Sequence, residues 1–215
     1  MNEDITRIGI YGGTFAPIHV GHVNAAMAFM DQMQLDYLFV IPAAIPPHKQ
    51  IDKSDDPIHR LRMCELAFEG MEGVVISDME IRREGKSYTV DTLREITRMC
   101  EEDSRLFLLM GTDMLLTLDS WREPDEIFRL CYPVYMRREG ADPILDARIV
   151  AKIADYQQKY GKVVRRIVGD PVVVSSTAVR RAVAEGKSIS HMVPPAVEKY
   201  IRENGLYKKA GGVTQ

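Results

Sequence analysis

The chain has 215 residues, with 28 Lys and Arg against 31 Asp and Glu, so its formal net charge is −3. Hydrophobic residues make up 46% and charged residues 27%, a composition typical of globular proteins that excludes disordered and fibrous chains. The small negative charge argues against nucleic acid as a partner, because the chain has no basic excess to replace counterions.

Three cysteines, Cys64, Cys100 and Cys131, lie far apart in the sequence and form no CxxC pair. Such spacing is typical of buried thiols in a reducing compartment rather than of disulfides or metal ligands. The first residues do not resemble a signal or transit peptide. The longest apolar stretch, 37–47, is interrupted by prolines and falls short of the ~20 residues that span a bilayer. We therefore expect a cytoplasmic protein with no membrane partner.

Apolar runs of strand length alternate with stretches of helical periodicity along the chain. Strands are predicted at 8–11, 37–41, 74–76, 106–110, 132–136 and 163–168. Helices are predicted around 23–30, 61–67, 90–97, 143–160, 177–186 and 194–204. This alternation, with strands that are apolar throughout, predicts an α/β fold with a Rossmann-like, doubly wound parallel sheet and helices on both faces.

No repeat, low-complexity tract or Gly/Ser linker divides the sequence. We therefore expect residues 1–209 to form a single domain and residues 210–215 to form a loose tail. The polar stretch 50–56 is expected to be a surface loop rather than a domain boundary.

The segment that follows the first predicted strand, 12–22, combines glycines, a threonine and two histidines. We expect Gly12 and Gly13 to allow a tight turn and a close backbone approach at a helix N-terminus that favours phosphate. His19 and His22, at i and i+3, are expected on one face of the first helical turn, directed at the same anion. The alternatives are a plain turn and half of a metal site, the latter disfavoured because no third ligand is near. The spacing of a P-loop is absent.

A second stretch, 174–181, places Ser175, Ser176 and Thr177 before Arg180 and Arg181. Taken alone, it favours an ordinary helix N-cap with solvated arginines. Together with the first segment it favours a second anion site, so that two helix N-termini at one sheet edge hold one polyphosphate.

The sequence resembles the nucleotidylyltransferase superfamily through an HxGH-type motif, Thr14–His22, and an SSTxxR-type motif, Ser175–Arg180. Five further segments resemble the bacterial nicotinate-nucleotide adenylyltransferases within it: Pro46–Lys49, Ser87–Leu93, Gly111–Asp113, Trp121 and 194–207. The resemblance covers residues 6–207.

Two positions depart from the family pattern. Ala16 stands where the family usually has Asp or Asn, so we expect a slightly looser loop, and Glu139 stands where Pro is common.

The resemblance implies transfer of AMP from ATP to nicotinate mononucleotide, with release of pyrophosphate. It implies catalytic roles for His19, His22, Thr14 and Arg180. The residues implied in ATP binding are Gly12, Gly13, Thr14, Phe15, His19, His22, Gly111, Asp113, Ser175, Ser176, Thr177 and Arg180. Those implied in acceptor binding are His48, Lys49, Thr89, Trp121 and Arg138, with Arg137 as an alternative to Arg138. Mg²⁺ is expected as the cofactor, held mainly by the ATP phosphates, with no metal site of the protein's own.

Three other functions remain open at this stage. One is adenylyl transfer to nicotinamide mononucleotide or pantetheine phosphate, and another is a nucleotide sensor without turnover. The third is a metal-dependent hydrolase that uses His19 and His22. The sequence leaves open whether the chain forms a homo-oligomer.

Overall fold

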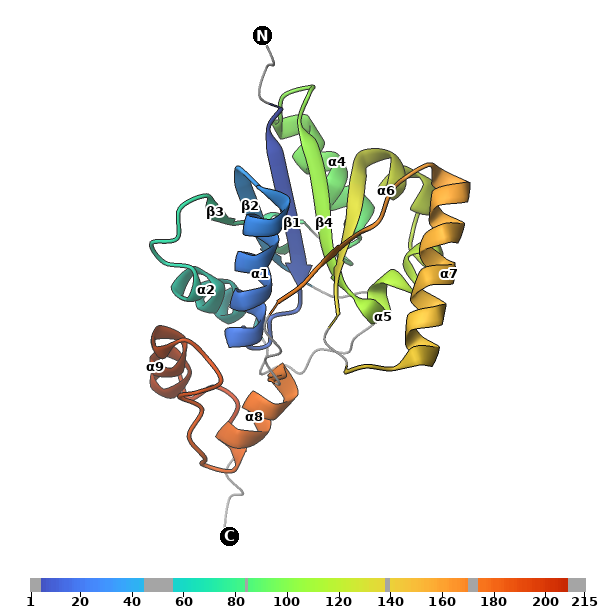
Figure 1. Cartoon of the computed structure of the whole chain (residues 1–215). Coiled ribbons are helices and arrows are strands. Elements are labelled where there is room, and N and C mark those ends of the chain that lie inside the picture. The colour runs from blue at the N-terminus through green and yellow to red at the C-terminus, as the bar shows by residue number, and fades with distance from the viewer. Residues whose placement is uncertain (1–4, 45–55, 84, 138–139, 170–173, 209–215) are drawn as a thin grey trace.

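The computed structural model of the chain describes residues 5–44, 56–83, 85–137, 140–169 and 174–208 (Figure 1). Its strands are β1 (Arg7–Gly13), β2 (Tyr37–Pro42), β3 (Val74–Ile76), β4 (Arg105–Gly111), β5 (Cys131–Met136) and β6 (Arg165–Ile167). Its longer helices are α1 (Val20–Met33), α2 (Pro57–Ala67), α4 (Thr89–Met99), α6 (Pro124–Leu130), α7 (Pro143–Tyr160), α8 (Ser176–Ala184) and α9 (Pro195–Glu203). Its single-turn helices are α3 (Met79–Arg82), α5 (Thr112–Leu115) and the 3₁₀ helix η1 (Leu118–Ser120).

The strands form one sheet in the order β3-β2-β1-β4-β5-β6, and every neighbouring pair is parallel. The chain starts at β1, moves outward through β2 and β3, and then returns to β4 on the other side of β1. The direction of winding therefore reverses between β1 and β4. This confirms the doubly wound parallel sheet that the sequence predicts.

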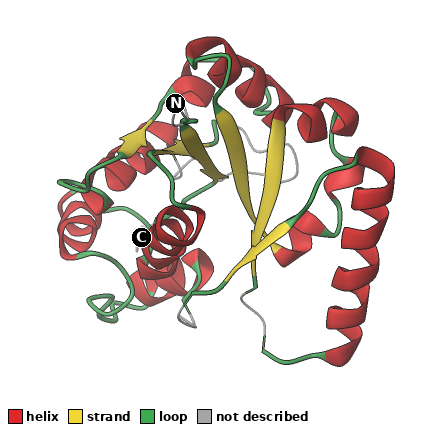
Figure 2. Cartoon of the chain, turned by 45° about the horizontal axis from the view of Figure 1, so that its top comes forward, coloured by secondary structure: helices red, strands yellow, loops and turns green. Residues whose placement is uncertain are grey.

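Helices cover both faces of the sheet (Figures 1 and 2). Because side chains alternate along a strand, β4 directs Phe107 and Leu109 into one apolar cluster, with residues of α1, α2, α8 and α9. Leu106, Leu108 and Met110 enter the opposite cluster, with residues of α4, α6 and α7. Burial on both sides explains why the strand sequence is apolar throughout.

The predicted elements agree with the structure except at their ends and in two regions. Strand β6 spans only Arg165–Ile167, shorter than the predicted 163–168, and β1 continues to Gly13. The sequence pattern indicated neither α3, which lies between β3 and α4, nor the helices α5, η1 and α6 between β4 and β5. Most of the predicted loop at 50–56 and the tail at 210–215 lie outside the described residues.

Candidate functional site

The pairing of β1 with β4 ends before either strand does. The paired residues run from Arg7↔Arg105 to Ile10↔Leu108, whereas β1 continues to Gly13 beside β2 and β4 continues to Gly111 beside β5. This end of the two strands is the point at which the winding of the sheet reverses. Ligands of open α/β sheets bind at such points, beyond the carboxyl ends of the strands.

Gly12 and Gly13 belong to β1, where they pair with Ile41 and Pro42, so the prediction of a tight turn at these glycines was wrong. Neither residue has a positive φ, and the turn follows at Ala16 and Pro17. A Cβ on Gly12 would meet no described atom within 4 Å, which leaves room for a ligand beside the backbone. A Cβ on Gly13 would lie 2.9 Å from Cζ of Phe15, so Gly13 is required for packing of the next loop.

Phe15 holds the loop between β1 and α1 in a strained backbone conformation. Its φ is +45°, a value that residues with a side chain rarely adopt. The ring is buried and packs edge-on against Tyr11 and His22, with ring centroids 5.3 and 5.1 Å apart. This aromatic packing stabilises a backbone that would otherwise be unfavourable. Phe15 therefore shapes the loop from within.

His19 and His22 lie together at the start of α1, as the sequence analysis predicts. His19 is the N-cap residue and is buried, whereas His22 is half-buried in the first turn. Their rings stack with centroids 3.6 Å apart. The backbone N–H of His19 donates to Nδ1 of His22 over 3.3 Å, which favours the tautomer with hydrogen on Nε2. His22 can thus present an N–H donor to an anion from its Nε2 atom.

The second motif contacts the loop of the first. Ser175 is the N-cap of α8, and its Oγ accepts from the backbone N–H of Ala178 over 3.1 Å. Ser176 Oγ donates to the carbonyl oxygen of Pro17 over 2.9 Å, and Arg180 Nη1 donates to that of Ala16 over 2.5 Å. The N-termini of α1 and α8 therefore lie at the same sheet edge (Figure 1).

Ala16 and Thr177 complete this contact between the two motifs. Ala16 is buried, and its carbonyl is held by Arg180 rather than by an Asx side chain of its own. Arg180 Nη2 also donates to Oγ1 of Thr177, which is exposed. The looser loop expected from Ala16 stays a prediction. In this structure the hydrogen bonds from Ser176 and Arg180 of α8 hold the loop.

Gly111 and Asp113 lie at the end of β4, on the other side of the switch point. Gly111 is the N-cap of α5, and Asp113 is exposed in the first turn of that helix. A Cβ on Gly111 would lie 2.9 Å from Oδ1 of Asp113. The two predicted residues are thus close neighbours, and glycine at 111 allows the carboxylate of Asp113 its position.

The predicted acceptor side begins at the N-terminus of α4, which Thr89 opens as a half-buried residue. Just before it, the buried Ser87 accepts a hydrogen bond at Oγ from the backbone N–H of Ala44 over 3.1 Å. Glu80 is also buried and accepts from Thr92 Oγ1 over 2.6 Å. Burial raises the pKa of Glu80 above its ordinary value, and hydrogen bonds from Thr92 and Ser87 oppose this rise. A buried polar network therefore supports this helix start.

Trp121 follows η1 and is half-buried against the apolar cluster that includes α4 and α6. Its side chain therefore lies partly in the core and partly in solvent. The guanidinium carbon of the neighbouring Arg122 lies 4.7 Å from the ring centroid of Tyr88. Tyr88 is the residue that precedes Thr89. The segment with Trp121 and the start of α4 are therefore adjacent.

Three predicted acceptor residues, His48, Lys49 and Arg138, lie outside the described residues. Arg137, the alternative to Arg138, pairs with Asp146 of α7 and donates to the carbonyl of Gly140 over 2.5 Å. Within the described part of the chain, Arg137 therefore connects the end of β5 to α7.

Sequence reasoning missed Arg60 and Glu80. Arg60 is fully buried on α2 and donates to the carbonyl oxygens of Thr14 and Ala44. One signal could have found it, since Arg60, Met63, Cys64 and Ala67 occupy one helical face and all are buried. An arginine in the apolar stripe of a helix requires polar partners inside the protein.

The described residues contain no group of three or more His, Cys, Asp or Glu side chains that could hold a metal ion. His19 and His22 thus form no metal centre with a third residue from this part of the chain. Among the same residues, no helix has the length and apolar character needed to cross a membrane.

Residues 10–182 match the model of the cytidylyltransferase-like family. A protein of Thermoanaerobacter sp. (strain X514), curated as "Probable nicotinate-nucleotide adenylyltransferase", is 36% identical over 203 residues, covering 94% of this chain and 95% of the relative. A protein of Pseudomonas fluorescens (strain Pf-5) with the same curated name is 36% identical over 210 residues, covering 94% and 97%.

Among solved structures, one of Plasmodium falciparum nicotinic acid mononucleotide adenylyltransferase complexed with NaAD superimposes with a TM-score of 0.71. The superposition covers 94% of this chain and 97% of the other, at 17% sequence identity. At this identity the match shows a shared fold, and it agrees with the sheet topology described above.

Proposed function

Because the chain belongs to the cytidylyltransferase-like family and, within it, to the nicotinate-nucleotide adenylyltransferases, we propose that it transfers AMP from ATP to nicotinate mononucleotide. The products are nicotinate adenine dinucleotide and pyrophosphate, in a step of NAD biosynthesis. The observation that supports this best is the contact of the two motifs, in which Ser176 and Arg180 bind the loop that leads to His19 and His22. Two helix N-termini then face one polyphosphate.

The reaction is the attack of the acceptor phosphate on the α-phosphorus of ATP. A new P–O bond forms, the bond to the bridging oxygen breaks, and pyrophosphate leaves with the electron pair. A phosphate monoester has a second pKa of about 6, so the nucleophile is already ionised at neutral pH and needs no general base. The protein therefore acts by alignment and by stabilising charge.

Donor groups at the switch point supply that charge stabilisation in our proposal. His22 offers Nε2–H, and the first N–H groups of α8, at Ser176 and Thr177, have no partners within their own helix. Thr14, His19 and Arg180 complete the catalytic set, and Gly12, which leaves open space beside β1, allows the substrate to approach. These donors fit the oxygens of a triphosphate.

On the acceptor side we propose Thr89 and Trp121, together with His48, Lys49 and Arg138; the contact of Arg122 with the ring of Tyr88, the residues next to Trp121 and Thr89, supports the first two. A hydroxyl and helix N-terminus at Thr89 suit the nicotinate carboxylate, and a half-buried indole at Trp121 suits a pyridine ring. Basic residues suit the acceptor phosphate.

We propose that Mg²⁺ enters the site with the triphosphate, because Mg²⁺ keeps several of its waters and is usually held by substrate phosphates with one or two carboxylates. Asp113, an exposed carboxylate at the edge of the site, is the residue that could hold a metal-bound water or the ATP ribose. When bound, the ion would neutralise charge on the polyphosphate.

The cytoplasm is the compartment that we propose. Cys64, Cys100 and Cys131 are all free thiols. Burial raises the pKa of Cys131 to about 12, which keeps this thiol protonated and unreactive. Unpaired, inert cysteines are typical of proteins in a reducing compartment.

The activity is tested by pyrophosphate release from purified protein with Mg-ATP and one acceptor at a time. We expect release with nicotinate mononucleotide and much slower release with nicotinamide mononucleotide or pantetheine phosphate. Replacement of ATP by CTP provides the control for the choice of nucleotide. Release with the nicotinamide form alone would refute the proposed acceptor, and ATP binding without any turnover would favour a sensor.

A further inference from the structure

Arg60 is a charged side chain in a core position. It is 0% exposed and lies on the face of α2 that also buries Met63 and Cys64. A guanidinium remains charged in proteins, and burial of a charge is unfavourable unless its donors are matched by acceptors. An apolar residue at this position would pack without that cost, so the contacts of Arg60 indicate what the charge contributes.

The guanidinium of Arg60 connects the ends of two neighbouring strands. Nη1 donates to the carbonyl oxygen of Thr14 over 2.7 Å, just after β1. Nη2 donates to the carbonyl oxygen of Ala44 over 3.1 Å, just after β2. One residue earlier, the N–H of Ala43 donates to the carbonyl of Gly13 over 2.9 Å. Arg60 thus continues the connection between the strands past the point where the sheet ends.

Ala44 is fixed from both sides of its backbone. Its carbonyl accepts from Arg60, and its N–H donates to Oγ of Ser87, which is itself buried and hydrogen-bonded with Glu80. Ser87 lies two residues before Thr89. Through Ala44, the fork of Arg60 is therefore linked to the start of α4, on the acceptor side of the site.

The hydrogen bond from Arg60 also polarises the peptide group between Thr14 and Phe15. The carbonyl of Thr14 belongs to the peptide group that carries the N–H of Phe15, and a charged donor on the oxygen polarises that whole group. The buried charge also adds positive potential beside the loop that leads to His19. Arg60 therefore acts on the phosphate side of the site as well as on the acceptor side.

We propose that Arg60 is a positioning residue that fixes the phosphate loop after β1 and, through Ala44 and Ser87, the start of α4 on the acceptor side in one alignment for adenylyl transfer. This inference rests on the proposed function. A displacement of ~1 Å between reacting groups can cost about 10²-fold in rate, so a side chain that sets the spacing of the two substrate sides affects turnover more than binding of either substrate.

The test compares Arg60→Lys with wild type by pyrophosphate release and by calorimetric titration with Mg-ATP. Lysine keeps the charge, but a single ammonium group lacks the planar fork that reaches both carbonyls. We expect turnover per ATP-binding site to fall by about tenfold or more, while the Kd for ATP stays within about threefold. A purely structural role would reduce the number of binding sites and leave turnover per site unchanged.

Two more variants make the outcome decisive. Arg62→Lys, two residues along α2 and exposed beside Glu65, is the matched control and should behave as wild type. Ser87→Ala removes the acceptor of the Ala44 N–H and should also lower turnover per site.

Turnover per site within about threefold of wild type in Arg60→Lys would overturn the inference. If Arg60→Lys does not fold, unchanged turnover in Ser87→Ala would overturn it. A wild type without turnover of nicotinate mononucleotide refutes the proposed function instead.

Discussion

At the scale of single residues, the stacked pair of His19 and His22 separates two tasks. His19 is 3% exposed, stacks its ring on that of His22 and donates its backbone N–H to Nδ1 of His22, so within the proposed catalytic set it also orients His22. His22 is half-buried and has its Nδ1 occupied by that bond. The Nε2–H donor of His22 is therefore oriented before the substrate binds. A preorganised donor of this kind contributes most where negative charge develops in the transition state.

His22→Ala should lower kcat by about 10²–10³-fold and leave the KM for ATP within about threefold, as expected for a contact made mainly in the transition state. Steady-state pyrophosphate release measures both constants. His191→Ala is the control, because His191 is an exposed histidine in the segment before α9. Equal changes in kcat and KM would show that His22 contributes to ground-state binding instead.

Residues with local patterns could be predicted from the sequence, and residues that act over long distances could not. The spacing of His19 and His22 predicted their common face, because i,i+3 neighbours on a helix lie together. The role of Arg60 depends on Thr14 and Ala44, which are 46 and 16 residues away and are brought to it only by the fold. Gly13 was predicted to be a turn residue, but glycine occurs both in turns and where the backbone packs closely. The sequence alone does not distinguish these two roles.

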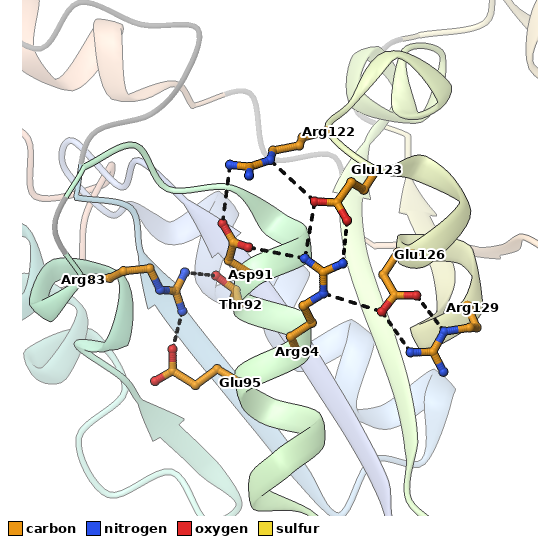
Figure 3. Close-up of polar contacts among 9 residues, drawn as sticks. All are labelled: Arg83, Asp91, Thr92, Arg94, Glu95, Arg122, Glu123, Glu126 and Arg129. Atoms are coloured by element: carbon orange, nitrogen blue, oxygen red, sulfur yellow. Dashed lines mark hydrogen bonds and ion pairs between the residues drawn. The ribbon is translucent and has the colours of Figure 1, made fainter.

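At the scale of elements, α4 and α6 are joined by a network of ion pairs around Arg94 (Figure 3). Arg94 pairs with Asp91 on its own helix, with Glu123 at 2.5 Å and with Glu126 of α6. Arg122 closes the network by pairing with Asp91 and Glu123. Arg122 and Glu123 directly follow Trp121, so the network attaches this segment to the helix that Thr89 opens.

Arg94→Ala should raise the KM for nicotinate mononucleotide by about threefold to tenfold and leave the KM for ATP unchanged, because only the acceptor side loses its alignment. A slightly lower Tm is expected as well, since ion pairs near the surface contribute little each. The measurements are steady-state kinetics with each substrate varied and a thermal melt.

Arg129→Ala is the matched control for Arg94. Among the described residues Arg129 pairs with Glu126, on the outer side of the same network, and it is more exposed than Arg94. Its removal should leave both KM values at the wild-type level. An equal rise of the two KM values in Arg94→Ala, or the same acceptor effect in Arg129→Ala, would contradict the placement of this network beside the acceptor.

The elements that the sequence predicted are those with long apolar patterns. Helix α7, with 18 residues, was predicted at its observed bounds because a long helix repeats its buried face several times and Gly161 ends it with a φ of +65°. Helix α6 has 7 residues, of which Ile127 and Phe128 are buried, so no helical period can be recognised. Its existence depends on packing against α4 and on the network of Arg94.

At the scale of the whole molecule, the site is assembled from the two ends of the chain. Ser176 reaches Pro17 and Arg180 reaches Ala16, separations of 159 and 164 residues in sequence. A second contact, between Val20 and the carbonyl of Met192, also connects the start of α1 to the C-terminal region. A triphosphate held between α1 and α8 would add to these contacts, so ATP should stabilise both segments together.

Hydrogen exchange with and without Mg-ATP measures this coupling across the molecule. Amides of the ATP-binding segments exchange when these segments unfold locally. If ATP binds only the folded segments, ATP at 100 times its Kd slows this exchange by about a hundredfold. We expect this slowing for amides between Thr14 and Val20 and between Ser176 and Arg180. Amides of α7, which belongs to the apolar cluster on the opposite face, serve as the internal control and should not change. Protection of the first segment without the second would show that α8 takes no part in ATP binding.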